Sequence, residues 1–130
     1  MRREGDGRPG RGRLAVVGIG PGDPAHLSAR ALEVLREAEV VIGYRPYLKL
    51  LADVLAPGQA VEGSGMRQEV LRARRAVELA LGGKRVVVVS SGDAGIYGMA
   101  GIVLEVLLET GEHGRVEFEV VPGITAASAA

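Results

Sequence analysis

The sequence predicts an α/β domain with a mostly parallel five-stranded sheet and helices on both faces. Short apolar runs alternate with helical patterns from Leu14 onward, which is typical of β-α-β units. One run, "VVVV" at 86–89, is the continuous apolar strand expected where both faces of a parallel sheet are covered. Polar loops follow three of the runs, and such sheets bind ligands beyond the carboxyl ends of their strands.

The expected elements follow one another with turn signals between them. Strands are predicted at 14–17, 40–42, 60–61, 86–89 and 116–121, and helices at 26–38, 46–55, 66–81 and 96–109, with another starting at 124. Apolar spacing predicts that the third helix buries Met66, Val70, Ala73, Val77 and Leu81, and the fourth Ala100, Val103, Leu104 and Leu107. Gly82-Gly83 and Gly111 are expected to end these two helices.

Composition and charge exclude several classes of function. The 130 residues are 47% apolar and 25% charged, which fits one ordinary domain. No apolar run approaches the roughly 20 residues of a membrane helix, and no secretory signal is visible, so we expect a cytoplasmic protein without a membrane partner. Zero net charge predicts no nucleic-acid partner. Without cysteine, and with only two distant histidines, no metal site is expected.

The two ends of the chain differ from the rest. Residues 1–13 hold five arginines against Glu4 and Asp6 and include four glycines, which predicts a disordered basic arm. The domain is therefore expected to span 14–130. The sequence stops just after its last predicted helix begins, so we expect this chain to be part of a longer protein.

The first glycine loop, "VVGIGPGDP" at 16–24, argues against a dinucleotide. The Rossmann fingerprint requires a third glycine where this chain has Asp23, and Pro21 removes a backbone donor. We expect Asp23 to cap the next helix, with Pro24 at its first position, where a carboxylate competes with phosphate for the backbone amides. An adenosine-type ligand without phosphate, such as S-adenosylmethionine, fits better. The alternative is a plain tight turn between strand and helix.

Three motifs in this order resemble the tetrapyrrole (corrin/porphyrin) methylase family. They are "GIGPGDP" at 18–24, "SSGDAGIYGMAG" at 90–101 and "VVPGITAASAA" at 120–130. Within the family, "IGYRPYLKLL" and "GSGMRQEV" look most like the enzymes that methylate carbon 17 of precorrin-3B or cobalt-factor III. The resemblance spans 14–130. It implies the N-terminal half of a two-domain fold, with the C-terminal domain absent from this chain.

The resemblance also implies the cofactor, the substrate and the cofactor-binding residues. Family members bind S-adenosylmethionine between their two domains, methylate a precorrin or cobalt-precorrin ring in cobalamin biosynthesis, and resemble homodimers. For the carbon-17 enzymes, ring contraction accompanies methylation, and any cobalt belongs to the substrate. The cofactor residues carried over are Gly20, Pro21, Gly22, Gly92, Asp93, Ile96, Thr125 and Ala126. Asp93 and Thr125 could equally cap helices. Ala94 replaces the family's usual proline, which should loosen that loop.

The substrate-side candidates follow the second and third strands. A proton-accepting residue follows the second strand in related enzymes, and Tyr44 occupies that place here. Because a tyrosine hydroxyl is a poor base at neutral pH, we expect it to donate a hydrogen bond to the macrocycle. Arg45 suits the carboxylate arms of such a substrate, with Tyr47 beside it, and Ser64 in "GSGM" is matched by position. For Arg45, a solvated loop position is the alternative.

Three other readings stay open at this point. The chain could be a non-catalytic fragment or binding module. It could belong to another tetrapyrrole methylase, such as a uroporphyrinogen III methyltransferase. A nucleotide-binding Rossmann-like domain is the third, although the missing ribose acid argues against it.

Overall fold

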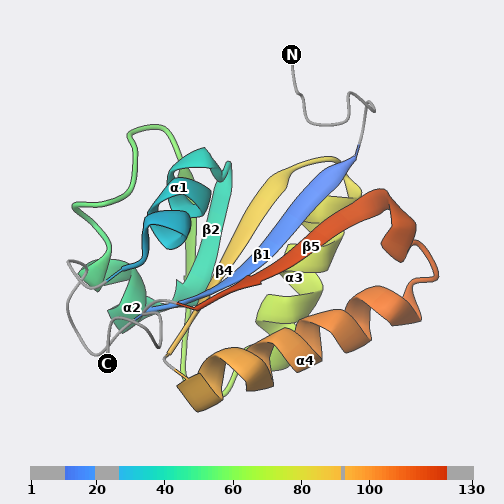
Figure 1. The fold of residues 1–130 in the computed structure, drawn as a ribbon. Helices are drawn as coiled ribbons and strands as arrows, with labels where there is room; N and C mark the ends of the chain where they lie inside the picture. The colour runs from blue at the N-terminus through green and yellow to red at the C-terminus, as the bar shows by residue number, and fades with distance from the viewer. Residues whose placement is uncertain (1–10, 20–26, 92, 123–130) are drawn as a thin grey trace.

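A computed structural model describes residues 11–19, 27–91 and 93–122. Five strands form one all-parallel sheet in the order β3-β2-β4-β1-β5 (Figure 1). The strands are β1 (Gly12–Gly18), β2 (Val40–Tyr44), β3 (Ala60–Ser64), β4 (Arg85–Ser90) and β5 (Val116–Val121). The helices are α1 (Ala29–Glu37), α2 (Arg45–Leu50), α3 (Glu69–Leu81) and α4 (Asp93–Glu109). The α/β fold class and its five strands are confirmed.

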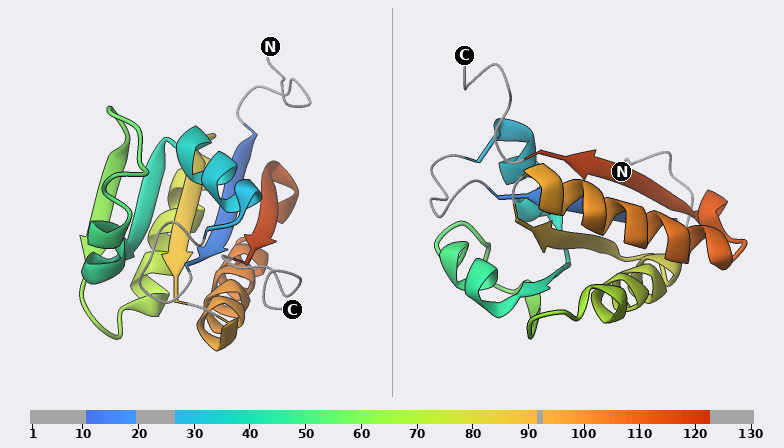
Figure 2. Two further views of the ribbon diagram at one scale, coloured as in Figure 1. Left: turned by 60° about the vertical axis from the view of Figure 1, so that its left-hand side comes forward. Right: turned by 90° about the horizontal axis from the view of Figure 1, so that it is seen from below.

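Helices cover both faces of the sheet, as predicted. The left view of Figure 2 shows α1 in front of the sheet and α3 behind it. The valines of β4 serve both layers, because neighbouring residues of a strand point to opposite faces. Val86 and Val88 pack against α3 and α4, whereas Val87 and Val89 pack against α1 and α2. Each of the four is at most 2% exposed.

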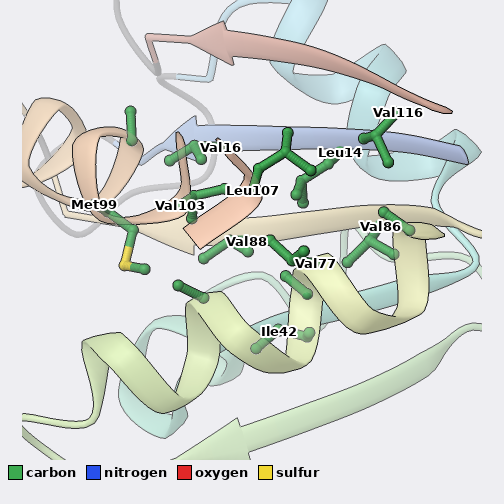
Figure 3. Close-up of a cluster of buried hydrophobic side chains, with 14 of the residues drawn as sticks. Leu14, Val16, Ile42, Val77, Val86, Val88, Met99, Val103, Leu107 and Val116 are labelled. Carbon is green, nitrogen blue, oxygen red and sulfur yellow. The ribbon is translucent and has the colours of Figure 1, made fainter. Parts of the chain in front are cut away.

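The larger core lies between the sheet and the helices α3 and α4 (Figure 3). Leu14 and Val16 of β1 point toward Val103 and Leu107 of α4, while Val77 approaches from α3. Small residues of α3 allow that helix to lie close to the strands, since Ala73, Ala76 and Ala80 are fully buried. Because α3 follows β3 and α4 follows β4, both helices begin at the carboxyl edge of the parallel sheet.

Several element boundaries differ from the sequence-based expectation. β1 starts at Gly12, so Gly12 and Arg13 belong to the sheet rather than to the arm. α1 starts at Ala29 and its N-cap is Ser28, whose hydroxyl accepts a hydrogen bond from Ala31 N, so Asp23 is not the cap of this helix. β3 extends to Ser64, four residues from its start at Ala60.

The buried stripes of α3 and α4 were predicted only in part. α3 begins at Glu69, so Met66 precedes it, and Val70 lies on its exposed side. The helix cannot begin earlier, because Arg67 has φ 62°, outside the right-handed helical region. On α4, Leu104 is 40% exposed, and the buried face is formed by Ile96, Met99, Ala100, Val103 and Leu107.

The described residues contain neither a membrane-spanning helix nor a cluster of metal-ligating side chains. No helix among them is long and apolar enough to cross a membrane. No group of three or more histidine, aspartate or glutamate side chains in the described ranges is arranged to hold a metal ion.

Candidate functional site

The three loops singled out by sequence leave the same edge of the sheet. β1 lies between β4 and β5, with Gly18 opposite Ser90 and Val17 opposite Val121. Ile19 N donates a hydrogen bond to Ser90 O at 2.9 Å, which keeps the first two loops together as they leave their strands. The strand ends therefore converge, as a common ligand wall requires.

Most predicted cofactor residues lie outside the described residues. These are Gly20, Pro21, Gly22, Gly92, Thr125 and Ala126. Asp93 is the first residue of α4. Ile96 is 2% exposed and packs in the core under α4, so its side chain supports the helix from below. The predicted roles of these residues in cofactor binding stay predictions.

A groove of about 470 Å³ lies at the carboxyl edge, bounded by the ends of β2 and β4 and the first turns of α3 and α4. Its polar and aromatic lining residues are Tyr44, Tyr47, Arg67, Glu69, Arg72, Ser90 and Ser91. Its apolar and small lining residues are Met66, Val89, Gly95, Gly98, Met99 and Ile102. Among the described lining residues, the charged side chains all come from the β3–α3 side, so the groove has one charged wall and, in its described part, one uncharged wall.

Tyr44 and Tyr47 form the aromatic part of the groove. Tyr44 ends β2, and Tyr47 follows in the short helix α2. Their ring centroids lie 5.2 Å apart at an interplanar angle of 84°, an edge-to-face arrangement. Both side chains are half-buried, and both line the groove. The structure thus brings together two of the residues predicted on the substrate side.

Arg72 is a groove residue that the sequence analysis missed. Its side chain is 8% exposed, and its Nη1 donates hydrogen bonds to Ser64 Oγ at 2.8 Å and Gly65 O at 3.0 Å. Nη2 lies 3.8 Å from Glu69 Oε2. Buried arginines are rare unless they are paired. Arg72 lies four and eight residues before the buried Ala76 and Ala80, and this spacing could have revealed it.

The turn between β3 and α3 presents Arg67 at the groove. Arg67 has the left-handed φ of 62°, which costs a non-glycine residue about 1 kcal/mol or more. The turn is held from within, because Gly65 N donates to Gln68 Oε1 at 2.7 Å. Ser64 pairs with Tyr44 across the sheet, so the turn and the tyrosine pair share one framework.

Arg45 and Ser64 occupy neighbouring places outside the groove lining. Arg45 is exposed, and its Cγ would lie 2.8 Å from a Cβ at Gly63, so the absence of a side chain there lets Arg45 cross β3. Ser64 accepts the hydrogen bond from Arg72 and so supports the wall rather than facing the groove. The predicted substrate residues therefore cluster at one corner of the groove, where Tyr44 and Tyr47 line it and Arg45 and Ser64 lie outside the lining.

The opposite wall is formed by the end of β4 and the start of α4. Ser90 is 7% exposed and Ser91 is half-buried. A Cβ at Gly95 would lie 2.0 Å from Ser91 Oγ, so the absence of a side chain lets that hydroxyl approach the first turn of α4. The described residues of this wall offer hydroxyl groups and open backbone, and none of them carries a charge.

Among the described residues, two carboxylates have lowered pKa values, and neither of them lines the groove. A hydrogen bond from Arg30 lowers the pKa of Glu119, and one from Arg75 lowers the pKa of Glu62. Arg75 contacts both Glu62 Oε atoms at 3.0 Å, which clamps α3 to the edge strand β3. These pairs stabilise the fold around the site rather than take part in it.

Comparison with known proteins agrees with this geometry. The family model of the Tetrapyrrole (Corrin/Porphyrin) Methylases matches residues 13–130. The chain belongs to this family. The resemblance to the tetrapyrrole methylases that the sequence motifs indicated is therefore confirmed.

Individual members of the tetrapyrrole methylase family give a narrower comparison. The chain is 48% identical to the cobalt-factor III methyltransferase of Priestia megaterium over 118 residues, which cover 89% of this chain and 22% of the relative. The crystal structure of the methyltransferase CobJ superposes with a TM-score of 0.77 at 39% identity, covering 92% of this chain and 49% of that one.

A third comparison concerns a relative solved with a ligand. The uroporphyrin-III C-methyltransferase of Thermus thermophilus, complexed with S-adenyl homocysteine, gives a TM-score of 0.62 at 35% identity, covering 88% of this chain and 46% of that one. This tetrapyrrole methylase chain thus spans about half the length of both solved structures and about a fifth of the Priestia relative.

Proposed function

We propose that the protein containing this chain transfers a methyl group from S-adenosylmethionine to carbon 17 of a precorrin or cobalt-precorrin ring, with ring contraction, in cobalamin biosynthesis. The observation that carries the proposal is the groove at the carboxyl edge, with one charged wall and one uncharged wall, in a chain of this family. The 48% identical cobalt-factor III methyltransferase supports this choice of substrate.

The uncharged wall fits a cofactor without phosphate. Ser90 and Ser91 offer hydroxyl groups, and Gly95 and Gly98 leave the backbone of α4 open. No arginine or lysine from β4 or α4 lines this wall in the described part of the chain, so it offers no described cation to pair with a pyrophosphate. The related structure with S-adenyl homocysteine supports the same choice. Ser90 of this wall pairs with Gly18 of β1, and the loop that follows β1 is one of those predicted to hold the cofactor.

The rest of the groove fits a flat ring with carboxylate arms. Tyr44 and Tyr47 from β2 and α2, together with Met99 and Ile102 from α4, provide aromatic and apolar surface for the ring. Arg67 lies at the edge of that surface, where an arm would emerge. A precorrin substrate combines these two properties, an apolar macrocycle and peripheral carboxylates.

Methyl transfer requires the protein to position the cofactor and the substrate rather than to provide a nucleophile. The bound cofactor supplies an electrophilic methyl group, and the nucleophile is a ring carbon of the substrate. Tyr44 donates a hydrogen bond to the macrocycle, while the apolar residues exclude water from the ring face. The half-buried place of Tyr44 beside Tyr47 limits the directions in which its hydroxyl can point.

Calorimetry and a methyl-transfer assay test the proposal in the full-length gene product. We expect S-adenosylhomocysteine to bind, and mass spectrometry to show one methyl group added to cobalt-factor III or precorrin-3B. Tyr44→Phe should lower kcat about tenfold, as expected for one lost hydrogen bond in the transition state. Tyr97→Phe is the matched control, because Tyr97 is 65% exposed and lies outside the groove.

Two outcomes contradict the proposal in different ways. Absence of both cofactor binding and methyl transfer would contradict the activity itself. Transfer to uroporphyrinogen III in place of the precorrins would retain methyl transfer and contradict the proposed substrate.

We also infer, from the family resemblance, a cytoplasmic homodimer. Light scattering on the purified protein measures the mass of the particle and so tests whether it is a dimer.

A further inference from the structure

We propose that the turn at 64–69 is a preformed carboxylate clamp, in which Arg67 binds a carboxylate arm of the substrate and Arg72 positions Arg67. The inference rests on the proposed function, because the ligand it requires is a ring with carboxylate arms. It gives roles to two residues to which the sequence analysis assigned none: Arg67, within "GSGMRQEV", and Arg72, which follows that motif.

Arg67 has the position and the freedom that such a contact needs. It lines the groove, as do the apolar residues Met66 and Ile102, and its side chain is exposed. Within the described residues no carboxylate forms an ion pair with Arg67, whereas Arg30, Arg75 and Arg115 each form at least one. Its planar fork matches a carboxylate bidentately.

The backbone of the turn is held in an unfavourable conformation. Arg67 has φ 62°, where an arginine is uncommon and a glycine would fit without strain. Strain of this kind persists only where the surroundings fix it, and it is concentrated at functional sites. A glycine at this position would serve the turn better, so the side chain itself is the feature that the local structure does not explain.

Arg72 provides the fixing. It reaches from the first turns of α3 to Ser64 Oγ and Gly65 O, so a helix packed on the sheet holds the start of the turn. Gln68 holds the same segment by accepting from Gly65 N. Because Arg72 is 8% exposed and already bonded, its effect on a ligand passes through the turn and through Arg67. It is a positioning residue.

The test measures binding of uroporphyrin, a polycarboxylated porphyrin, by absorbance titration, and of S-adenosylhomocysteine by calorimetry, in the full-length gene product. Arg67→Gly keeps the left-handed backbone and removes the guanidinium. We expect the Kd for uroporphyrin to rise about tenfold, with the Kd for S-adenosylhomocysteine unchanged and Tm equal or higher. Arg67→Lys should retain part of the affinity. Arg74→Ala, on the exposed side of α3, is the charge-matched control and should leave the Kd unchanged.

A double variant tests whether Arg72 acts through Arg67. Arg72→Met should raise the Kd for uroporphyrin and lower Tm, because two hydrogen bonds to the turn are lost. Combined with Arg67→Gly, it should raise the Kd no further, since residues acting as one unit are not additive. A merely structural role predicts additive losses in Kd and would contradict the positioning role.

The outcomes separate this inference from the proposed function. If the wild-type protein binds S-adenosylhomocysteine and uroporphyrin, and Arg67→Gly binds uroporphyrin equally well, the clamp is wrong and the function stands. If the wild-type protein binds neither, the proposed function is wrong and the clamp with it.

Discussion

Arg30 on α1 and Glu119 on β5 are joined by two parallel hydrogen bonds, although 89 residues separate them in the chain. Nε donates to Oε2 at 2.8 Å and Nη2 donates to Oε1 at 2.7 Å. The pair fastens a helix to the edge strand of the sheet. Beside it, Ser28, the cap of α1, donates through its hydroxyl to Pro122 O at 3.2 Å, close to where β5 ends.

Removing the charge of Glu119 should make stability less sensitive to acid. The hydrogen bond from Arg30 lowers the pKa of Glu119 below its ordinary value of 4.5. A lowered pKa contributes stability above the unfolded value, and the contribution is lost as pH falls through the folded pKa. Since both side chains are more than a third exposed, we expect Glu119→Gln to cost only about 0.5–1 kcal/mol at neutral pH.

Thermal unfolding between pH 7 and pH 3 checks this prediction. The difference in Tm between wild type and Glu119→Gln should shrink as pH falls below about 4.5. Glu105→Gln, on the exposed face of α4, should follow the wild type throughout. A difference that stays constant down to pH 3 would show that the carboxylate charge is not what matters.

Gly12 should be intolerant of any side chain. A Cβ there would lie 1.8 Å from the carbonyl oxygen of Ala80, near the end of α3, and backbone atoms cannot turn away as a side chain can. We expect Gly12→Ala to cost about 3 kcal/mol or more, measured by urea unfolding. Gly114→Ala is the control, because no heavy atom lies within 4 Å of its Cβ. Equal stability of the two variants would contradict this packing.

The sequence predicted how the helices and the sheet are layered better than it predicted the order of the strands within the sheet. Four consecutive valines mark a strand covered on both faces, and the structure places them so. The strand order β3-β2-β4-β1-β5 depends on pairings between distant segments, which no local pattern records. The predicted start of the third helix at residue 66 was wrong. Met66 and Val70 continue the apolar spacing of α3, but the left-handed backbone at Arg67 prevents the helix from extending back to Met66.

The candidate site was predictable where it depends on motifs and not where it depends on packing. Tyr44 and Tyr47 follow a strand, and the structure brings them to the groove. Arg72 was missed because an arginine in a helix is expected on the solvent side, whereas here hydrogen bonds to the turn compensate for its burial. The supporting role of Ser64 follows from that same contact and has no sequence signal.

Gln59 should be more sensitive to a change of charge than to truncation. Its Nε2 donates to Leu35 O and Ala38 O, each at 2.7 Å, at the end of α1, and its Oε1 accepts from Ala56 N. Gln59→Ala leaves those carbonyl groups without this donor, at a cost of about 1–2 kcal/mol. Gln59→Glu also places a negative charge at a helix C-terminus, which is unfavourable. Urea unfolding should rank wild type above Gln59→Ala and Gln59→Ala above Gln59→Glu; the reverse order of the variants would contradict these contacts.

Gly95 and Gly101 both lie on α4, but alanine should change cofactor affinity at Gly95 and stability at Gly101. At Gly95 the added Cβ would lie 2.0 Å from Ser91 Oγ, so the hydroxyl must turn away from the first turn of α4. A serine hydroxyl rotates easily, so we expect little loss of stability but a Kd for S-adenosylhomocysteine about five- to tenfold higher, because Ser91 belongs to the proposed cofactor wall.

At Gly101 nothing lies within 4 Å of a Cβ, and alanine there should add about 0.5–1 kcal/mol of stability through helix propensity while leaving the Kd unchanged. Calorimetric titration and thermal unfolding of the two variants in the full-length gene product separate these effects. Unchanged cofactor affinity in Gly95→Ala would remove Ser91 from the proposed cofactor wall, whereas equal losses of affinity in both variants would show that α4 as a whole, rather than the hydroxyl, had moved.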